Sequence, residues 1–154
     1  MLHKKRALAA ALAAGALGAT ALTGTVANAA PAEVNAPRVG GCVGKAFAGT
    51  LGPGKAICNG NYLVRMQTNG DLVLRVISTG MACWTSGTNR APGGDTSAVF
   101  VGNKFGAPWV DIESESQGRL TRIVGAHTYL HFGTNANVNT RGEFWIGYKK
   151  IAGC

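Results

Sequence analysis

The feature of the sequence that most constrains its fold is an internal repeat of short β-type units. Residues 69–89 resemble residues 117–135 when a gap of two residues is allowed, and residues 141–148 form a shorter third copy. In each copy a glycine is followed two positions later by a large apolar residue; the pairs are Gly70 and Leu72, Gly118 and Leu120, and Gly142 and Phe144. One such unit cannot bury its apolar face alone, whereas three units that face a common axis can. The repeat therefore predicts three related β units in one domain.

Strand-like runs are separated by glycine-rich turns along the rest of the chain. Residues 62–67 and 72–76 are β-type runs, and Asn69-Gly70 lies between them. An Asn-Gly pair in this place favours a hairpin with a type I′ turn, in which both central residues have positive φ. Further strands are expected over 97–101, 108–113, 119–124, 127–132 and 143–148. With 23 glycines and no clear helical pattern, the chain is expected to be all-β, as a barrel, sandwich or prism.

The N-terminus has the layout of a secretory signal peptide. Basic residues at 4–6 precede an uncharged run over 7–22, and a small-residue cleavage site follows at 27–29. The run is short and rich in alanine for a membrane anchor, so a signal peptide over 1–29 is expected instead. The protein is therefore expected to be secreted and extracellular.

Removal of the signal would leave a loose leader over 30–41 and one domain over 42–154. The whole chain has 15 Lys and Arg against 7 Asp and Glu, a net charge of +8, and loss of the three basic residues at 4–6 lowers it to +5. The remaining basic residues are scattered, so nucleic acid is not an expected partner. This moderate charge favours solubility, with a general attraction to anionic cell walls or membranes as the alternative. No later stretch is long and apolar enough to span a bilayer.

The expected domain contains all four cysteines of the chain: Cys42, Cys58, Cys83 and Cys154. An even number in a small secreted domain indicates two disulfides, each worth roughly 2–4 kcal/mol through restriction of the unfolded chain. Three pairings are open. The favoured one joins Cys58 to Cys83, which closes a local unit, and Cys42 to Cys154, which ties the ends. A zinc site is the weaker alternative because no CxxC pair is present, so no metal or other cofactor is expected.

Residues 51–88 resemble the bulb-type, mannose-binding lectins. That family reads roughly LxxGxxLxxGxYxLxMQxDxNxVxY, followed by a tryptophan and a small polar run. The matching positions are Leu51, Gly54, Ile57, Gly60, Tyr62, Val64, Met66, Gln67, Val73, Trp84 and Thr88. The resemblance is clear over 51–88 and extends over 42–148 through the weaker repeats. It implies the all-β fold called β-prism II, with three diverged four-stranded β units around a pseudo-threefold axis.

The sugar contacts of that family lie at alternate positions along one strand face, and here these carbohydrate-binding positions are Gln67, Asn69, Asp71, Val73 and Arg75. Amide and carboxylate groups would bond vicinal hydroxyls, and Val73 would contact sugar carbons. Relative to the family, Asp and Asn have exchanged places and a tyrosine has become Arg75, which favours an anionic ligand such as an acidic sugar or phosphate. The other copies keep no such set; they carry Glu115, Gln117, Arg119, Thr121 and Ile123, then Asn139, Arg141, Glu143, Trp145 and Gly147. The sequence thus predicts at most one, altered, sugar site.

Tryptophans and histidines at other positions are expected to be structural. Trp84, Trp109 and Trp145 lie near corresponding points of the three units, and core packing is the usual use of a tryptophan on a strand. His127 and His131 lie four positions apart in an expected strand, so they are not a paired site as they would be on a helix. A surface or structural role is expected for both histidines.

Acidic residues at 111, 113 and 115 alternate along one expected strand face. Such a face could hold calcium, yet no other clustered oxygen ligands are evident, so a solvated face is favoured. Arg119 and Arg122 are expected to neutralise it across the sheet.

These features together predict a secreted carbohydrate-binding protein of the mannose-lectin type, whose partner is a carbohydrate or cell-surface glycan. An enzyme is not expected, because a nucleophile elbow, a sugar-hydrolase carboxylate pair and a Cys/His dyad are all absent from the sequence. Two alternatives remain open: a lectin-fold antibacterial or envelope-interaction protein, and a structural matrix or coat protein without sugar binding. The resemblance also implies a homodimer by exchange of terminal strands, which an intramolecular Cys42–Cys154 bond would oppose.

Overall fold

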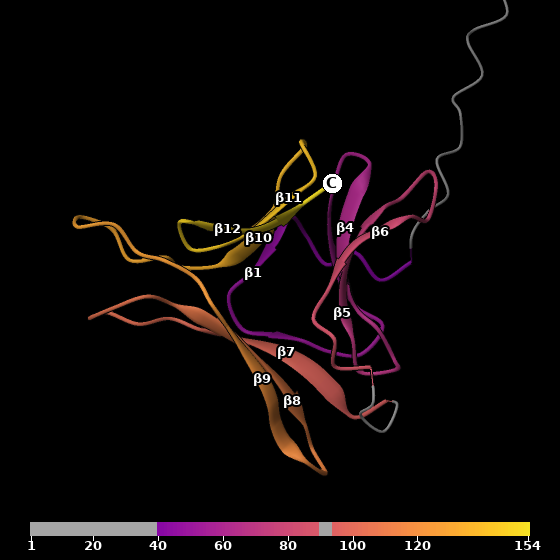
Figure 1. Ribbon diagram of the computed structural model, residues 1–154, viewed down its shortest axis with the longest axis horizontal. Coiled ribbons are helices and arrows are strands. Elements are labelled where there is room, and N and C mark those ends of the chain that lie inside the picture. The colour runs from indigo at the N-terminus through magenta and orange to yellow at the C-terminus, as the bar shows by residue number, and fades with distance from the viewer. Residues whose placement is uncertain (1–39, 90–93) are drawn as a thin grey trace, which may run out of the picture. The chain divides into compact units, whose positions relative to one another are not determined.

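The regular structure of the described residues, 40–89 and 94–154, consists of β-strands in this computed structural model. The strands form three four-stranded antiparallel sheets (Figure 1). The prediction of an all-β chain is confirmed for these residues. The expected signal peptide over 1–29 and nearly all of the expected leader over 30–41 lie outside the described residues. Within the described part of the chain, no helix has the length and apolarity needed to cross a membrane.

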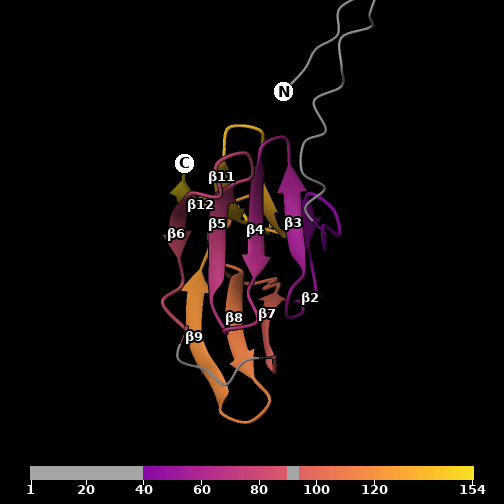
Figure 2. The same cartoon turned by 90° about the vertical axis from the view of Figure 1, so that its right-hand side faces the viewer.

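The three sheets are numbered first, second and third. The first sheet has the order β3 (Ala56–Asn59), β4 (Tyr62–Met66), β5 (Leu72–Val76), β6 (Ala82–Thr85), and Figure 2 shows these strands side by side. The second sheet has the order β2 (Thr50–Leu51), β7 (Thr96–Val101), β8 (Trp109–Ser114), β9 (Gly118–Val124). The third sheet has the order β1 (Ala46–Phe47), β10 (Ala136–Val138), β11 (Glu143–Ile146), β12 (Lys149–Gly153). The segment that precedes β3 therefore gives one short strand to each of the other two sheets.

The hairpin between β4 and β5 forms where the Asn-Gly signal predicts it, with a different turn. The N–H of Gln67 donates to the carbonyl of Asp71, and the N–H of Gly70 donates to the carbonyl of Gln67. The β-turn is therefore centred on residues 68 and 69, and Gly70 follows it with a φ of 89°. The connection is a three-residue loop, so the prediction of a two-residue type I′ turn is wrong.

The apolar residues of the repeat lie in one core that all three sheets share. Leu72 and Phe144 have no exposed surface, and Leu120 is partly buried against the same cluster. The same strands and their neighbours contribute further inward side chains, which include Val64, Met66, Leu74, Val110, Ile112 and Ile146. Each fully buried side chain of this kind stabilises the fold by roughly 1.5–3 kcal/mol. Each sheet therefore buries one face against the other two.

Residues 127–132 form a turn, so the prediction of a strand there is wrong. The N–H of Thr128 donates to the carbonyl of His131 at 3.0 Å, and the N–H of His131 donates to the Thr128 hydroxyl at 3.1 Å. These bonds close the chain on itself, and the side chains of Tyr129 and Leu130 project into solvent. Both histidines of this segment are exposed, as expected.

The disulfides join Cys42 to Cys58 and Cys83 to Cys154, so their existence is confirmed and the favoured pairing is wrong. Cys58 lies in β3 and Cys83 in β6, which are the two edges of the first sheet. Three strand spacings separate these edges, roughly 14 Å, whereas disulfides need Cα atoms within about 7 Å. The chain before β1 runs beside β3 through a parallel bridge between Cys42 and Ala56, which brings the Cα atoms of Cys42 and Cys58 to 5.7 Å.

Candidate functional site

The five residues predicted to contact sugar lie together on the β4–β5 hairpin. Gln67 and Asn69 belong to the turn, and Asp71, Val73 and Arg75 follow one another on the face of the first sheet that points away from the core. Only 6 % of Asp71 and 2 % of Val73 is exposed. Two of the five predicted contacts are therefore covered by the protein itself.

The segment that begins in β6 covers the Asp71 carboxylate. The hydroxyl of Thr85 donates a hydrogen bond to it, the hydroxyl of Ser86 donates at 2.7 Å, and the N–H of Thr88 donates at 3.2 Å. These donors come from the protein's own chain and occupy both carboxylate oxygens. Asp71 thereby fastens β6 to the hairpin.

The remaining polar groups of the first hairpin are also partly engaged. The Arg75 guanidinium donates to the carbonyl of Gly80 at 2.7 Å, and the Asn69 side-chain oxygen accepts from the N–H of Asp71 at 3.2 Å. The hairpin presents chiefly the amide groups of Gln67 and Asn69, together with the unused N–H groups of Arg75. Carbohydrate contact by this set stays a prediction.

The β10–β11 hairpin of the third sheet repeats the geometry of the first hairpin. The N–H of Asn139 donates to the carbonyl of Glu143, and the N–H of Gly142 donates to the carbonyl of Asn139. These bonds correspond to those of Gln67, Gly70 and Asp71, and Gly142 has a φ of 76°. The two turns are therefore equivalent, which places Asn139 and Glu143 where the first hairpin has Gln67 and Asp71.

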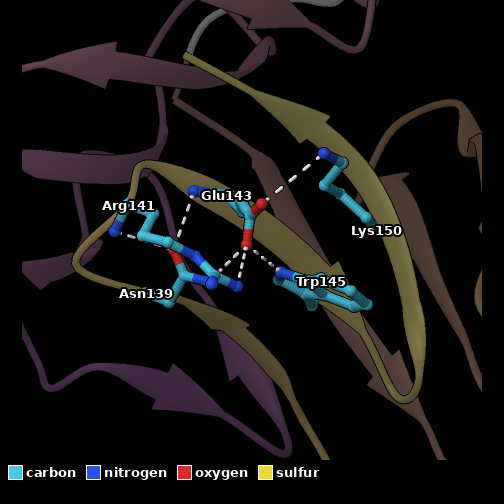
Figure 3. Close-up of polar contacts among 5 residues, drawn as sticks. All are labelled: Asn139, Arg141, Glu143, Trp145 and Lys150. Carbon is cyan, nitrogen blue, oxygen red and sulfur yellow. Dashed lines mark hydrogen bonds and ion pairs between the residues drawn. The ribbon is translucent and has the colours of Figure 1, made fainter.

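Polar and aromatic side chains gather around Glu143 on this hairpin (Figure 3). The carboxylate oxygen Oε2 accepts from Asn139 Nδ2 at 2.6 Å, Arg141 at 3.0 Å and Trp145 Nε1 at 3.3 Å. The other oxygen, Oε1, lies 3.5 Å from Lys150 Nζ. We call these five residues the Glu143 cluster.

Strand alternation brings the Glu143 cluster to the outer face. Phe144 and Ile146 point into the core without exposed surface, so Glu143 and Trp145 point outward from the same strand. A bulge between Phe144 and Trp145 shifts the β11–β12 register, which sets Trp145 opposite Lys150. The order of residues in β11 and one irregularity in its pairing thus position the cluster.

The carboxyl group of Glu143 is held in its ionised form. Hydrogen bonds from Asn139 and Arg141 to the carboxylate, with a smaller contribution from Trp145, lower its pKa from 4.5 to about 2. The side chain of Glu143 is 18 % exposed, whereas those of Arg141 and Lys150 are 75 % and 52 % exposed. The buried side of the cluster is anionic, and its rim is cationic.

A polar pocket of about 200 Å³ lies beside the Glu143 cluster. Its lining consists of Gly133, Thr134, Asn135, Asn137, Gly147 and Tyr148. Asn137 is the direct cross-strand partner of Trp145, so the pocket and the cluster share one face of the third sheet. The Asn137 amide donates to the Asn135 side-chain oxygen at 3.0 Å, which orients both side chains.

Two backbones cross closely at the floor of this pocket. A Cβ atom added to Gly133 would lie 2.3 Å from the Cα of Gly147 and 2.8 Å from a ring carbon of Pro108. Gly147 itself has a φ of 57° and no room for a side chain. The pocket therefore depends on glycine at both positions.

The second sheet carries a related cluster, in which the charged and polar groups bond to one another. Trp109 Nε1 donates to Asp111 Oδ2 at 3.0 Å, and Arg122 donates to both oxygens of that carboxylate at 2.8 Å. The guanidinium carbon of Arg122 lies 4.3 Å from the centre of the Trp109 ring. The Arg122 hydrogen bonds are the main cause that lowers the pKa of Asp111. The expected neutralisation by Arg122 is confirmed, and the described residues include no group of three or more His, Cys, Asp or Glu that could hold a metal ion.

The tryptophans of the three sheets divide into two kinds. Trp84 packs against the core, with its ring centre 5.8 Å from that of Phe144, so the prediction of core packing is confirmed for it. The same prediction is wrong for Trp109 and Trp145, which are half-buried on outer faces and donate to carboxylates. An indole N–H needs an acceptor when it is shielded from water, and Asp111 and Glu143 provide it from two positions away.

The third-sheet site is not among the sites that the sequence pattern predicts. Asn139, Arg141, Glu143 and Trp145 do not keep the family's Gln-Asp-Asn order, and Lys150 lies outside the repeat. The alternation of Glu143 and Trp145 next to Phe144 was the one local signal of an outward polar face. A comparison of the chain with protein-family models, curated proteins and solved structures finds no match.

Proposed function

We propose that this protein is a secreted, extracellular carbohydrate-binding protein with a lectin-like β-prism II architecture, in which three diverged four-stranded units surround a pseudo-threefold axis. We further propose that it binds its ligand on the outer face of the third sheet. The observation that carries the proposal is the Glu143 cluster, because its residues Asn139, Arg141, Glu143 and Trp145 occupy hairpin positions that would contact sugar in the bulb-lectin resemblance. Its amide, carboxylate and indole are held in fixed positions beside a polar pocket.

The chemistry of this face suits a saccharide. Thr134, Asn137 and Tyr148 offer hydroxyl and amide groups for vicinal hydroxyls, and the half-buried Trp145 ring offers an apolar surface for sugar carbons. Glu143 Oε1 accepts from a sugar hydroxyl, because its nearest cationic partner, the ammonium of Lys150, is 3.5 Å away. A single polar site of this kind is expected to bind weakly, because the ligand exchanges hydrogen bonds with water for hydrogen bonds with the protein.

The cationic rim selects among saccharides. The side chains of Arg141 and Lys150 are mostly exposed and flank the ionised Glu143. A carboxylate or phosphate on the ligand would meet the guanidinium and the ammonium there, since both donate and neither accepts hydrogen bonds. The preferred ligand is therefore an acidic saccharide rather than a neutral hexose.

An extracellular location is supported by two independent features. The chain contains two disulfides, which persist in oxidising compartments. The N-terminal sequence has a basic region, an apolar run and a small-residue cleavage site. An extracellular saccharide-binding face has its ligands on cell walls and cell surfaces.

Calorimetric titration and a glycan array test the proposal. The unchanged protein is expected to bind uronic-acid or phosphorylated saccharides with a dissociation constant on the order of 0.1–1 mM, as weak single sites do. Trp145→Ala removes the apolar contact with the sugar and is expected to weaken binding at least tenfold. A tenfold loss of affinity corresponds to about 1.4 kcal/mol of binding free energy. Gln67→Ala, at the first-hairpin position equivalent to Asn139 of the Glu143 cluster, is the control and should leave affinity unchanged.

Different outcomes of these experiments test the location of the binding site and the carbohydrate-binding function separately. Absence of binding to any glycan at millimolar concentration would overturn carbohydrate binding itself. Binding that survives Trp145→Ala and is lost in Gln67→Ala would move the site to the first hairpin. Equal affinity for neutral and acidic saccharides would contradict the role given to Arg141 and Lys150.

A further inference from the structure

Two loops beside the third-sheet site, one of which also contributes Gly133, Thr134 and Asn135 to the polar pocket, expose aromatic and aliphatic side chains. The β7–β8 loop, residues 102–108, carries Phe105 at 97 % exposure. The β9–β10 loop, residues 125–135, carries Tyr129 at 100 % and Leu130 at 75 % exposure. A single exposed apolar residue is ordinary on a protein surface, whereas a group of them marks an interaction surface.

The two loops belong to one surface. Figure 1 shows them extending from the sheets on the same side, and residues of both line a single groove of about 330 Å³. Lys104 comes from the first loop and Phe132 from the second. The N–H of Gly125 donates to the carbonyl of Pro108 at 2.8 Å, which ties the bases of the loops together. We call these two loops the aromatic loops.

Hydrogen bonds hold the tips of the aromatic loops in place. Thr128 and His131 bond to each other through their backbones and the Thr128 hydroxyl, which fixes Tyr129 and Leu130 at the point of a turn. The N–H of Phe105 donates to the Asn103 side-chain oxygen at 3.0 Å. Because the tips are already formed, little conformational entropy is lost when they meet a partner.

The charged side chains within the two loops have one sign. Neither 102–108 nor 125–135 contains Asp or Glu, whereas Lys104 directly precedes Phe105 and Lys149 lies at the start of β12 in the third sheet. Both lysines are exposed. Apolar tips beside lysines, without any carboxylate in either loop, complement a surface that is apolar inside and anionic outside.

We propose that the aromatic loops dock this protein on an anionic lipid bilayer. Phe105 and Leu130 enter the boundary between headgroups and acyl chains, and Tyr129 lies at headgroup level, where its ring is buried and its hydroxyl stays hydrated. Lys104 faces the anionic headgroups, which attract a lysine close to the membrane surface. The protein lies on the bilayer through these loops and does not span it.

Vesicle flotation tests the proposal with purified protein whose disulfides are formed. One set of vesicles contains phosphatidylglycerol and phosphatidylcholine in equal parts, and the other contains phosphatidylcholine alone. The unchanged protein is expected to float with the first set and much less with the second, and added salt should release it. The double variant Tyr129→Ser/Leu130→Ser is expected to lower the partition coefficient at least tenfold, because two apolar contacts are lost.

Two further variants make the test specific. Phe105→Ser changes the other loop and should weaken partitioning in the same direction, so the result does not depend on one variant. Met81→Ser is the matched control, because Met81 is an apolar residue at 57 % exposure in the β5–β6 connection of the first sheet. Its partitioning should equal that of the unchanged protein.

Several results would overturn the proposal. Flotation of the protein with neither set of vesicles, or equal flotation with both sets, would contradict the proposal. A loss of partitioning in Met81→Ser as large as that in Tyr129→Ser/Leu130→Ser would contradict it as well. Size-exclusion chromatography can give a further result that would overturn the proposal. A dimer that becomes monomeric in Tyr129→Ser/Leu130→Ser, with no flotation, would assign the aromatic loops to a contact between two copies of the chain.

Discussion

The Cys83–Cys154 disulfide joins β6 of the first sheet to the end of β12 in the third sheet, over a sequence separation of 71. The Cys42–Cys58 disulfide closes a separation of only 16. A cross-link restricts the unfolded chain more when its loop is longer, so the two bonds should stabilise the protein unequally. The loop-entropy relation gives about 4 kcal/mol for the longer loop and about 3 kcal/mol for the shorter one.

Two double variants measure this difference. Each disulfide joins one half-buried cysteine to one exposed cysteine, so the packing lost on substitution is similar and loop length decides the order. Denaturant unfolding is expected to show that Cys83→Ser/Cys154→Ser lowers the free energy of unfolding by about 1 kcal/mol more than Cys42→Ser/Cys58→Ser does. Equal losses, or the reverse order, would refute the reasoning from loop length.

The pairing itself can be checked on the same proteins. In the structure, Cys83→Ser/Cys154→Ser leaves the Cys42–Cys58 bond intact, so a thiol reagent should find no free thiol in the unfolded, unreduced variant. In the pairing favoured from the sequence, both partners of the substituted residues would remain as thiols. Mass spectrometry of unreduced peptides from the unchanged protein is the control, and a peptide joining Cys58 to Cys83 would contradict the structure.

The acidic groups of the two hairpins give two further predictions. Because the pKa of Glu143 falls from 4.5 to about 2 on folding, its contribution to stability is present above pH 4.5 and is lost as the pH falls through about 2. The Tm of the unchanged protein should therefore drop more steeply over that range than the Tm of Glu143→Gln, and parallel Tm curves would contradict the assignment. Asp71→Ala leaves the donors of Ser86 and Thr88 without their acceptor and should lower the free energy of unfolding by about 2–4 kcal/mol. Denaturant titration checks this against Asn69→Ala on the exposed turn, which should cost less than about 1 kcal/mol, and an equal loss in both variants would count against a structural Asp71.

Local features of the sequence determined most of the strand framework. The glycines of the repeat and the apolar residues two positions later, such as Gly142 and Phe144, specify a turn and an inward side chain through backbone conformation and strand alternation alone. These rules act between neighbours in the chain, so the hairpins and much of the core follow from the sequence. The outward pairing of Arg122 with Asp111 follows in the same way from facing strands.

The segment over 127–132 shows where local rules end. Its alternating aromatic pattern is typical of a strand, yet a strand needs a partner to satisfy its backbone groups. In the tertiary structure the segment bonds to itself through Thr128 and His131. Its apolar side chains therefore face solvent, a result that no pattern within the segment indicates.

The sequence by itself determined that this chain forms related β-hairpins with four cysteines in the same domain. Only the tertiary structure decided which cysteines pair, because that depends on β3 and β6 being opposite edges of one sheet. The tertiary structure also decided which hairpin leaves its outward polar groups accessible to a ligand. The covering of Asp71 by Thr85 and Ser86, and the exposure of the equivalent Glu143 cluster, depend on where the neighbouring strand runs. Contacts between segments far apart in the chain set these outcomes, and the spacing of residues within a segment carries no information about them.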